Sequence, residues 1–466
     1  MNFSEGKMNT LDAISVVDGR YASKTDELRD IFSEYGLIRH RVFVEVEWLK
    51  FILSKLGFDD APQGVIDAID AIYTGFNTES GLMVKKFESV TNHDVKSVEY
   101  YVKDQLENRG LGHLKEWVHF CCTSEDINNT SYALMIKKGK KIVCDTLREV
   151  LEKIEALARD NKAVPMMART HGQPATPTTV GKEFINFAAR FRRELDILEK
   201  IEVECKFSGA TGNWNAHVAA KPDVDWLSAA EDFISNSLGA KPLIWTTQIN
   251  NYHYISEIFH TLIRICSTLI DMDRDIWTYI SLAYFKQKPK EGEVGSSTMP
   301  HKINPIDFEN SEGNSGVAIS LMEHLSTKLL NSRLQRDLTD STVLRNIGII
   351  FGYILISLKN CKKGLSKIEV NYPKIAEDLE ENLELLAEPV QTVMRVYGEE
   401  NPYEKLKSLT RGKKIERIAL DEFIDSLEKV PADVKEKLKK LTPSTYLGIA
   451  EKLVDEYFRR NGGKGE

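Results

Sequence analysis

Residues Cys144 to Asp160 have the sequence CDTLREVLEKIEALARD, and this stretch decides the fold class. Its apolar residues recur at intervals of three and four, which places them on one face of an α-helix. The apolar residues of Phe184 to Leu198 follow the same spacing. Both stretches lie in long intervals without proline, a residue that ends or kinks helices. We therefore expect long uninterrupted helices here.

A third interval without proline contains Val317 to Leu358. If helical, it is long enough to form one rod or to cross a domain more than once. Signals for strands and hairpins are scarce, since the only Asp-Gly pair is Asp18-Gly19 and the only Asn-Gly pair lies in the C-terminal tail. The sequence therefore predicts an all-α protein.

Two boundaries are expected, one near residues 117–123 and one near 362–368, after which helical patterns become shorter, more charged and richer in proline. A chain of 466 residues is long enough for about three domains at ~150 residues each. The predicted domains are 1–119, an N-terminal helical domain; 120–364, a central long-helix bundle; and 365–466, a C-terminal helical domain.

Charge and composition exclude several classes of function. Lys plus Arg number 62 and Asp plus Glu 70, which gives a net charge of −8. Such a chain is a poor general binder of nucleic acid or anionic membrane, so the positive charge for any anionic ligand must be concentrated in a pocket. With 42% hydrophobic residues the chain is typical of a soluble globular protein.

The sequence also favours a cytoplasmic location. The longest apolar stretch, Ile347 to Leu358, is 12 residues long, short of the ~20 that cross a bilayer. Met1 to Asp18 contains no apolar signal core. The six cysteines show no CxxC pair and no zinc-like spacing, so we expect reduced thiols.

Several common catalytic motifs are absent from the sequence. There is no Gly-rich dinucleotide fingerprint, no GxxxxGK phosphate loop, no HExxH and no GxSxG. Most histidines show no ligand spacing, and we expect no metal site and a structural role for them: His40, His113, His119, His217, His253, His260, His301 and His324.

The most informative segment is Gly295 to Pro305, with the sequence GSSTMPHKINP. Small residues, hydroxyls, a lysine and an asparagine are crowded between two prolines, a composition that does not suit a helix face. Such a loop can surround a carboxylate, with Lys302, Asn304 and backbone N–H groups as donors. A serine of this loop can act as a base if the same donors stabilise its alkoxide.

This segment resembles the GSSxMPxKxNP signature of the fumarase/aspartase superfamily. Within it, the chain resembles the adenylosuccinate lyase family, specifically its bacterial-type branch, over nearly the full length. The segments that carry this closer resemblance are VDGRY (17–21), TNHDVK (91–96), TSEDINN (123–129), RTHGQP (169–174) and QRDLTDSTVLR (335–345).

The resemblance implies a fold, an assembly and a reaction. The fold is a three-domain all-α one whose central long-helix bundle forms the core of a homotetramer, with active sites drawn from three chains. The reaction eliminates fumarate from adenylosuccinate, giving AMP, or from the analogous succinyl-carboxamide ribotide (SAICAR), giving AICAR, without metal or organic cofactor. We expect closure of the polar segment 285–295 over the site as a lid.

The resemblance also assigns roles. His171 would be the general acid that protonates the departing nitrogen, and Ser296 the base that removes the Cβ proton. The choice of Ser296 over Ser297 comes from the resemblance, because sequence alone does not separate neighbours. The implied substrate contacts are Arg20, Tyr21, Asn92, His93, Asp94, Thr123, Ser124, Gln248, Ser297, Lys302, Asn304, Asn310, Arg336, Ser341 and Arg345.

Each assignment has a structural alternative. Thr91–Asp94 and Thr123–Asp126 are also helix starts, in which Asn, Asp or hydroxyl side chains cap N–H groups. Arg20, Arg336 and Arg345 suit a nucleotide phosphate, although a single arginine is more often on a solvated helix face. Two other functions stay open: another fumarate-releasing lyase, acting on argininosuccinate, aspartate or malate, or a non-catalytic helical scaffold.

Overall fold

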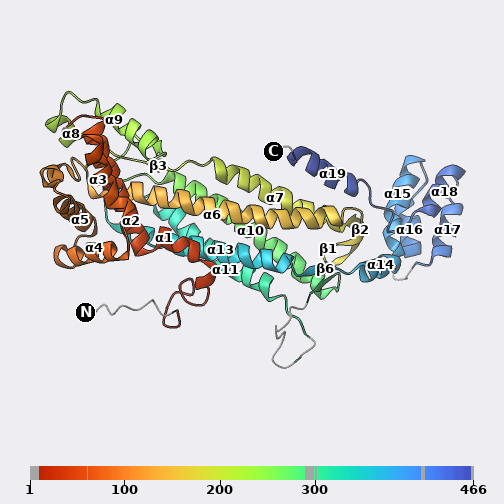
Figure 1. Cartoon of the computed structure of the whole chain (residues 1–466). Helices are drawn as coiled ribbons and strands as arrows, with labels where there is room; N and C mark the ends of the chain where they lie inside the picture. The colour runs from red at the N-terminus through yellow and green to blue at the C-terminus, as the bar shows by residue number, and fades with distance from the viewer. Residues whose placement is uncertain (1–9, 60, 289–298, 300–301, 411–414, 463–466) are drawn as a thin grey trace. The chain divides into compact units, whose positions relative to one another are not determined.

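The computed structural model describes residues 10–59, 61–288, 299, 302–410 and 415–462 (Figure 1). Helices dominate these residues, and three two-stranded sheets are the only strand pairings among them. The all-α prediction is confirmed.

The chain divides into two compact units. The first comprises Met1–Leu147, Glu194–Ser267 and Ser311–Lys359, and the second comprises Arg148–Arg193, Thr268–Asn310 and Asn360–Glu466. Among the described residues, the helices with residues in both units are α6 (Ser124–Asp160), α7 (Val180–Lys200), α10 (His253–Ser281), α11 (Ile306–Lys328) and α13 (Ile347–Leu365). The division into 1–119, 120–364 and 365–466 stays a prediction.

The remaining elements of the first unit are short or medium in length. They are η1 (Ala22–Lys24), η2 (Asp26–Leu28), α1 (Arg29–Phe32), α2 (Glu34–Ser54), α3 (Gln63–Thr74), α4 (Thr78–Thr91), α5 (Asp94–Asn108), η3 (Gly112–Trp117), β3 (Glu204–Cys205), α8 (Asn215–Ala220), α9 (Trp226–Asp232), the π-helical η4 (Phe233–Ser237), β4 (Lys241–Pro242) and α12 (Thr339–Leu344). Helix α2 packs against α3, α4 and α5, and β3 pairs with β4 in parallel.

Among the described residues, the second unit contains two pairs of strands together with shorter helices. Its elements are β1 (Pro165–Thr170), β2 (Gln173–Thr179), β5 (Phe285–Gln287), β6 (Ile368–Val370), α14 (Tyr372–Glu380), η5 (Leu383–Leu386), α15 (Ala387–Val396), α16 (Pro402–Thr410), α17 (Arg417–Asp425), α18 (Ala432–Lys440) and α19 (Ala450–Asn461). The strand pairs are β1 with β2 and β5 with β6. Helices α15 to α18, drawn in blue in Figure 1, enclose a small core that includes Met394, Leu420 and Ile424.

The apolar helix faces predicted from the sequence are buried in the structure. In α6 the side chains of Leu147, Val150 and Ile154 are fully buried, and in α7 those of Ala188, Phe191 and Leu198 are. The long interval from Val317 to Leu358 is not one helix, because α11, α12 and α13 follow one another in it.

The interruption between α11 and α12 has a local polar cause. The carboxylate of Asp337 accepts the backbone N–H groups of Arg333 at 3.1 Å and Thr339 at 2.8 Å. Aspartate that satisfies nearby backbone donors competes with helical hydrogen bonds. Leu334 has a φ of 50°, in the left-handed region. Gln335 and Arg336 therefore lie in the turn between α11 and α12 and not in a helix.

Residues 339–365 are long and apolar enough, by length and composition alone, to span a membrane. The same residues form α12 and α13, and 56% of the most apolar window is buried inside the protein. A Cβ added to Gly348 would lie 2.6 Å from the Cβ of Phe32, and one on Gly352 would lie 2.7 Å from Val17 Cγ1. These glycines let the N-terminal segment pack directly on α13, as in the core of a protein.

Two segments that carry no strand pattern in the sequence form strands. Arg169–Pro174 belongs to an antiparallel hairpin, in which β1 and β2 are joined by His171 and Gly172. Both turn residues have positive φ, 53° and 75°, as a two-residue hairpin turn requires. Phe285–Gln287, assigned to a polar loop, forms β5 and pairs with β6. Residues 289–295 lie outside the described residues, so the lid stays a prediction.

A buried histidine in the first unit makes stability depend on pH. His40 on α2 is 4% exposed, its Nδ1 lies 2.7 Å from Gly36 O, and Lys138 Nζ donates to its Nε2 at 2.9 Å. Burial, with the charge of Lys138, lowers the pKa of His40 to about 4. The neutral ring is therefore the form that the folded state accommodates.

We predict that acid weakens the fold through His40. Its folded pKa is below that of the unfolded chain, so its contribution is complete above about pH 6.5 and is lost as the pH falls toward 4, by about 3 kcal/mol. Urea unfolding of His40→Gln at pH 7 and pH 4 should show a pH dependence smaller by that amount. The exposed His324→Gln is the control, and an unchanged pH dependence in His40→Gln would contradict the prediction.

Candidate functional site

A cavity of about 630 Å³ in the first unit contains most of the predicted substrate contacts. Its lining residues come from α2, α4–α6, α12 and the segments beside them. They are Arg41, Glu88, Asn92, His93, Asp94, Thr123, Ser124, Asn128, Tyr132, Gln248, Arg336, Leu338, Ser341, Thr342 and Arg345. Residues predicted from four separate parts of the sequence thus meet at one place.

The junction of α4 and α5 supplies one wall of the cavity. Asn92 ends α4 in the left-handed conformation, with φ of 51°. His93 is the N-cap of α5, and its Nδ1 accepts the backbone N–H of Lys96 at 3.2 Å. An Nδ1 that accepts a hydrogen bond carries no proton, so the neutral ring has its proton on Nε2. The capping side chain is therefore that of His93 and not the expected Asn or Asp, while Asp94 accepts the adjacent Val95 N–H at 2.9 Å.

The start of α6 supplies a second wall. The helix begins at Ser124, as the sequence predicts, and Asp126 accepts the backbone N–H of Thr123 at 2.8 Å. This is the reciprocal half of a capping box, in which the third residue of the helix reaches back to the N-cap. The hydroxyls of Thr123 and Ser124 are thereby placed at a helix N-terminus, where the macrodipole favours anions.

A buried ion pair holds this helix start in place. Lys206 Nζ lies 2.9 Å from Asp126 Oδ1, and both side chains are 0% exposed. Lys206 also donates to the carbonyls of Gly209 and Gln248 at 2.9 and 2.8 Å. Asp126 accepts the N–H of Ser208 at 3.0 Å as well. A buried ion pair is tolerated only when its remaining hydrogen-bonding capacity is filled, as it is here.

A second buried carboxylate positions Arg336. Glu125 is 1% exposed, and its two oxygens accept from Tyr252 Oη at 2.6 Å and Arg336 Nη1 at 2.9 Å. Burial and the neighbouring Asp340 raise the pKa of Glu125, while these two hydrogen bonds lower it. Arg336 Nη2 lies 3.4 Å from Ser341 Oγ, which joins these two predicted phosphate contacts.

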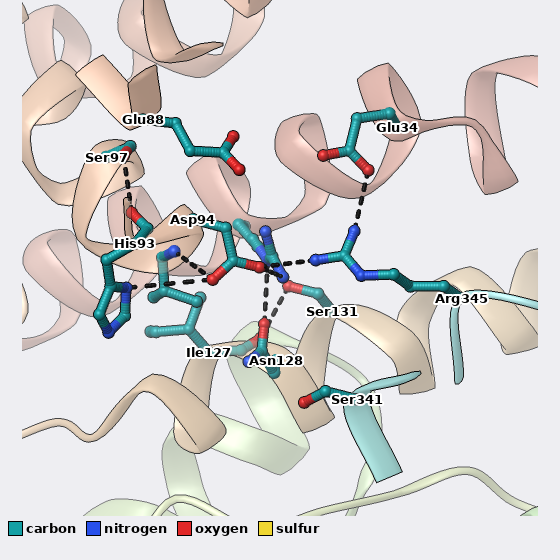
Figure 2. A network of polar contacts seen from close by, with 12 residues as sticks. Glu34, Glu88, His93, Asp94, Ser97, Ile127, Asn128, Ser131, Ser341 and Arg345 are labelled. Atoms are coloured by element: carbon teal, nitrogen blue, oxygen red, sulfur yellow. Dashed lines mark hydrogen bonds and ion pairs between the residues drawn. The ribbon is translucent and has the colours of Figure 1, made fainter. Parts of the chain in front are cut away.

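A shared carboxylate links the other two arginines of the cavity (Figure 2). Asp94 Oδ2 accepts from Arg41 Nη2 and from Arg345 Nη2, each at 2.8 Å. Burial raises the pKa of Asp94, but the two guanidinium groups and the Val95 N–H outweigh it and the pKa is lowered. Arg345 Nη1 also donates to Glu34 Oε2 at 3.0 Å.

Both the backbone and the side chain of Gln248 form hydrogen bonds with neighbouring segments. Its N–H donates to Gln335 O at 3.3 Å, its carbonyl accepts from Lys206, and its amide donates to Ala210 O at 2.9 Å. The wall beside Arg336 is therefore attached to the wall beside Ser124.

Other predicted residues do not line this cavity. Arg20 and Tyr21 stack at 5.9 Å on the segment before η1, with Arg20 exposed. Asn310 lies on α11 and accepts from Asn360. Lys302 is exposed and Asn304 half-buried, both before α11. Ser296 and Ser297 lie outside the described residues. The roles of all these residues stay predictions.

His171 lies in the second unit, at the tip of the β1–β2 hairpin, and its side chain is exposed. Arg169, in the same hairpin, pairs with Asp378 of α14 at 3.5 Å. Pro174 and Pro177 within β2 hid this hairpin from sequence analysis, because proline argues against a strand. The turn presents the imidazole to solvent without packing it against its own strands.

Sequence analysis missed several residues of the cavity, chiefly Arg41 and Asn128. Arg41 is 2% exposed on α2 and donates through Nε to Asn128 Oδ1 at 2.9 Å. An arginine among the apolar residues of Leu37 to Val46 was the available signal, since a buried arginine requires partners. Glu88, Tyr132, Leu338 and Thr342 carried no comparable signal.

The six cysteines are all free, and the described residues contain no cluster of His, Cys, Asp or Glu suited to a metal ion. Cys121 and Cys122 precede the start of α6. Burial raises the pKa of the Cys121 thiol to about 11, so it is a poor nucleophile near neutral pH.

Comparison with known proteins identifies the family of this chain. Residues 19–320 match the family described as Lyase, and residues 332–447 match the family described as Adenylosuccinate lyase C-terminal. Adenylosuccinate lyases of Haemophilus influenzae and Escherichia coli K12 are each 49% identical to this chain over 455 residues, covering 97% of it and 99% of each relative. The chain belongs to the adenylosuccinate lyase family.

Solved structures support the fold. A fumarate lyase from Mesorhizobium sp. BNC1 superimposes with a TM-score of 0.77 at 19% identity, covering 94% of this chain and 98% of that one. The 3-carboxy-cis,cis-muconate lactonizing enzyme from Pseudomonas putida superimposes with a TM-score of 0.75 at 18% identity, covering 94% and 97%. At these identities the two likenesses show the fold alone, and they agree with the predicted all-α architecture.

We predict that Lys206→Met destabilises the fold by about 3–5 kcal/mol, because it leaves Asp126 charged, buried and without its cation. Chemical unfolding measures the loss. Lys140→Met is the matched control, since Lys140 Nζ also donates to backbone carbonyls, those of Leu198 and Ile201, but pairs with no buried carboxylate. Equal losses in the two variants would contradict a special role for the ion pair.

Proposed function

We propose that this protein catalyses the β-elimination of fumarate from adenylosuccinate, giving AMP, and from the analogous succinyl-carboxamide ribotide (SAICAR), giving AICAR, in purine nucleotide biosynthesis. The observation that carries the proposal is the convergence of nine predicted substrate contacts on one cavity in a chain of this family. They are Asn92, His93, Asp94, Thr123, Ser124, Gln248, Arg336, Ser341 and Arg345.

The donors of the cavity suit a substrate with a phosphate and two carboxylates. Arg336, Ser341 and Arg345 lie together and offer guanidinium and hydroxyl donors to phosphate oxygens. The hydroxyls of Thr123 and Ser124, at the start of α6, suit a carboxylate of the succinyl group. The local cluster explains how a chain with a net charge of −8 can bind such an anion.

The proposed chemistry proceeds in two steps. Ser296, as alkoxide, removes the Cβ proton, and the electron pair of the C–H bond is delocalised into the adjacent carboxylate. Lys302, Asn304 and backbone N–H groups hold that charge. The C–N bond then breaks, and His171 donates a proton to the departing nitrogen. Fumarate and the nucleotide leave, and no metal or organic cofactor takes part.

We further propose a cytoplasmic homotetramer in which each active site combines the 93 and 123 regions, the 171 region and the 295–305 loop from three chains. The exposed position of His171 and its absence from the lining of the cavity within one chain support this division of labour. The six free thiols agree with the proposed compartment.

The first test is ultraviolet absorbance of adenylosuccinate with the purified protein. We expect the substrate spectrum to be lost as fumarate and AMP appear, and turnover to fall at least 10³-fold in His171→Ala and in Ser296→Ala, because each lacks one proton-transfer group. Both variants should keep the native assembly and thermal stability. Turnover of argininosuccinate or aspartate in place of adenylosuccinate would identify a different lyase, and turnover of none of these would favour a scaffold.

The second test concerns the assembly. Activity and mass should fall together on dilution, because a single chain lacks a complete site. Mixing inactive His171→Ala with inactive Ser296→Ala should restore part of the activity, since some sites then receive both groups intact. Full activity in an isolated monomer would refute the shared site.

A further inference from the structure

We propose that Glu34 is a specificity-determining counter-ion, which holds Arg345 while the cavity is empty and which the phosphate of a ligand must displace. The inference deepens the proposed function and rests on it for the identity of the nucleotide. It concerns the first unit alone, since Glu34, Asp94 and Arg345 all belong to it.

Every arginine of the cavity already has a carboxylate partner. Arg336 pairs with Glu125, Arg41 with Asp94, and Arg345 with both Asp94 and Glu34. Figure 2 shows Arg345 between these last two carboxylates. The guanidinium charges are therefore compensated before any ligand arrives, and an anion must replace a carboxylate to use one of them fully.

Two of the three arginines are poorly placed for such an exchange. Arg41 is 2% exposed, and both Asp94 and Asn128 hold it. Arg336 pairs with Glu125, which is 1% exposed and cannot be rehydrated if the arginine leaves it. Arg345 differs, because 43% of its side chain is exposed and 44% of Glu34 is.

Each partner of Arg345 keeps another cation when Arg345 turns away. Asp94 keeps Arg41 at 2.8 Å, and Glu34 keeps Lys85, whose Nζ lies 3.3 Å from Oε1. Glu34 is also in the first turn of α2, where the helix macrodipole favours a carboxylate. Neither carboxylate is left isolated, so releasing Arg345 costs little.

Glu34 is the partner that gives way. Asp94 lines the cavity and is fixed by the Val95 N–H as well as by Arg41. Glu34 does not line this cavity, but it lines two smaller hollows next to Arg345. Arg345 thus has Glu34 on one side and the cavity on the other, and its Nη1 can exchange the carboxylate for a ligand oxygen.

The exchange favours doubly charged ligands. A phosphate dianion attracts the guanidinium more strongly than one partly hydrated carboxylate does, whereas a singly charged anion gains little by the exchange. When the phosphorylated product leaves, Glu34 recaptures Arg345. Glu34 therefore selects for the phosphate group and limits inhibition by product.

The test compares Glu34→Gln with wild type, using the full-length assembled protein at low ionic strength. Calorimetric titration should show AMP and inorganic phosphate binding about 3–10 times more tightly to Glu34→Gln, and the KM for adenylosuccinate should fall by a similar factor. The selectivity for phosphate over a singly charged anion such as nitrate should decrease. Inhibition by AMP should become stronger, with kcat changed less than KM.

Glu88→Gln is the charge-matched control. Glu88 lines the same cavity and pairs with Lys85, whereas Arg345 pairs with Glu34 and Asp94. A gain in affinity of the same size in Glu88→Gln would assign the effect to net charge and overturn the proposal. Weaker binding of phosphate by Glu34→Gln would overturn it too, since Glu34 would then orient Arg345 for the ligand.

The phosphate titration also separates this inference from the proposed function. Tighter phosphate binding by Glu34→Gln in a protein that does not turn over adenylosuccinate would retain the counter-ion and reject the lyase. Normal turnover by Glu34→Gln, with unchanged affinity for phosphate and AMP, would retain the lyase and reject the counter-ion.

Discussion

The buried pair of Lys206 and Asp126 is the interaction on which the cavity depends. Asp126 ties the start of α6 to the 208–209 segment, and Lys206 ties both to the carbonyl of Gln248. Three segments that are far apart in sequence are therefore joined by one charge pair with no exposed surface. Because both charges would be costly alone, the pair fixes a single arrangement of the backbone. The ion pair thereby also fixes the positions of the Thr123 and Ser124 hydroxyls.

Carboxylate–cation pairs also occur at the rim of the cavity, but they differ in how exposed they are. Glu125 and Asp126 are adjacent at the start of α6 and both fully buried, yet one holds Arg336 and the other Lys206. Exposure decides which pairs are fixed and which exchange. Pairs with almost no solvent access define the shape of the site, whereas the half-exposed pair of Glu34 and Arg345 is weak enough for a ligand to replace.

Much of this was predictable from the sequence, and the failures have physical causes. Long amphipathic helices follow from spacing alone, and short motifs at helix starts located His93, Thr123 and Ser124. The break before α12 was not predictable, because it depends on Asp337 accepting backbone N–H groups in competition with the helix. The hairpin around His171 was hidden by its prolines, and a left-handed histidine is an unusual turn residue. Arg41 was missed since its function lies entirely in contacts with Asp94 and Asn128, from other helices.

These contrasts agree with the roles that we propose for binding residues and for His171 in the elimination. Binding donors gather where buried ion pairs and helix starts leave little freedom, which suits recognition of a fixed pattern of charge. His171 instead stands on a two-residue turn, exposed and outside that lining. A proton donor placed in this way contributes only when another surface encloses it, because water would otherwise compete for its proton. The proposed site, completed by neighbouring copies, would satisfy both requirements: rigid recognition within one chain, and proton transfer that is active only after assembly.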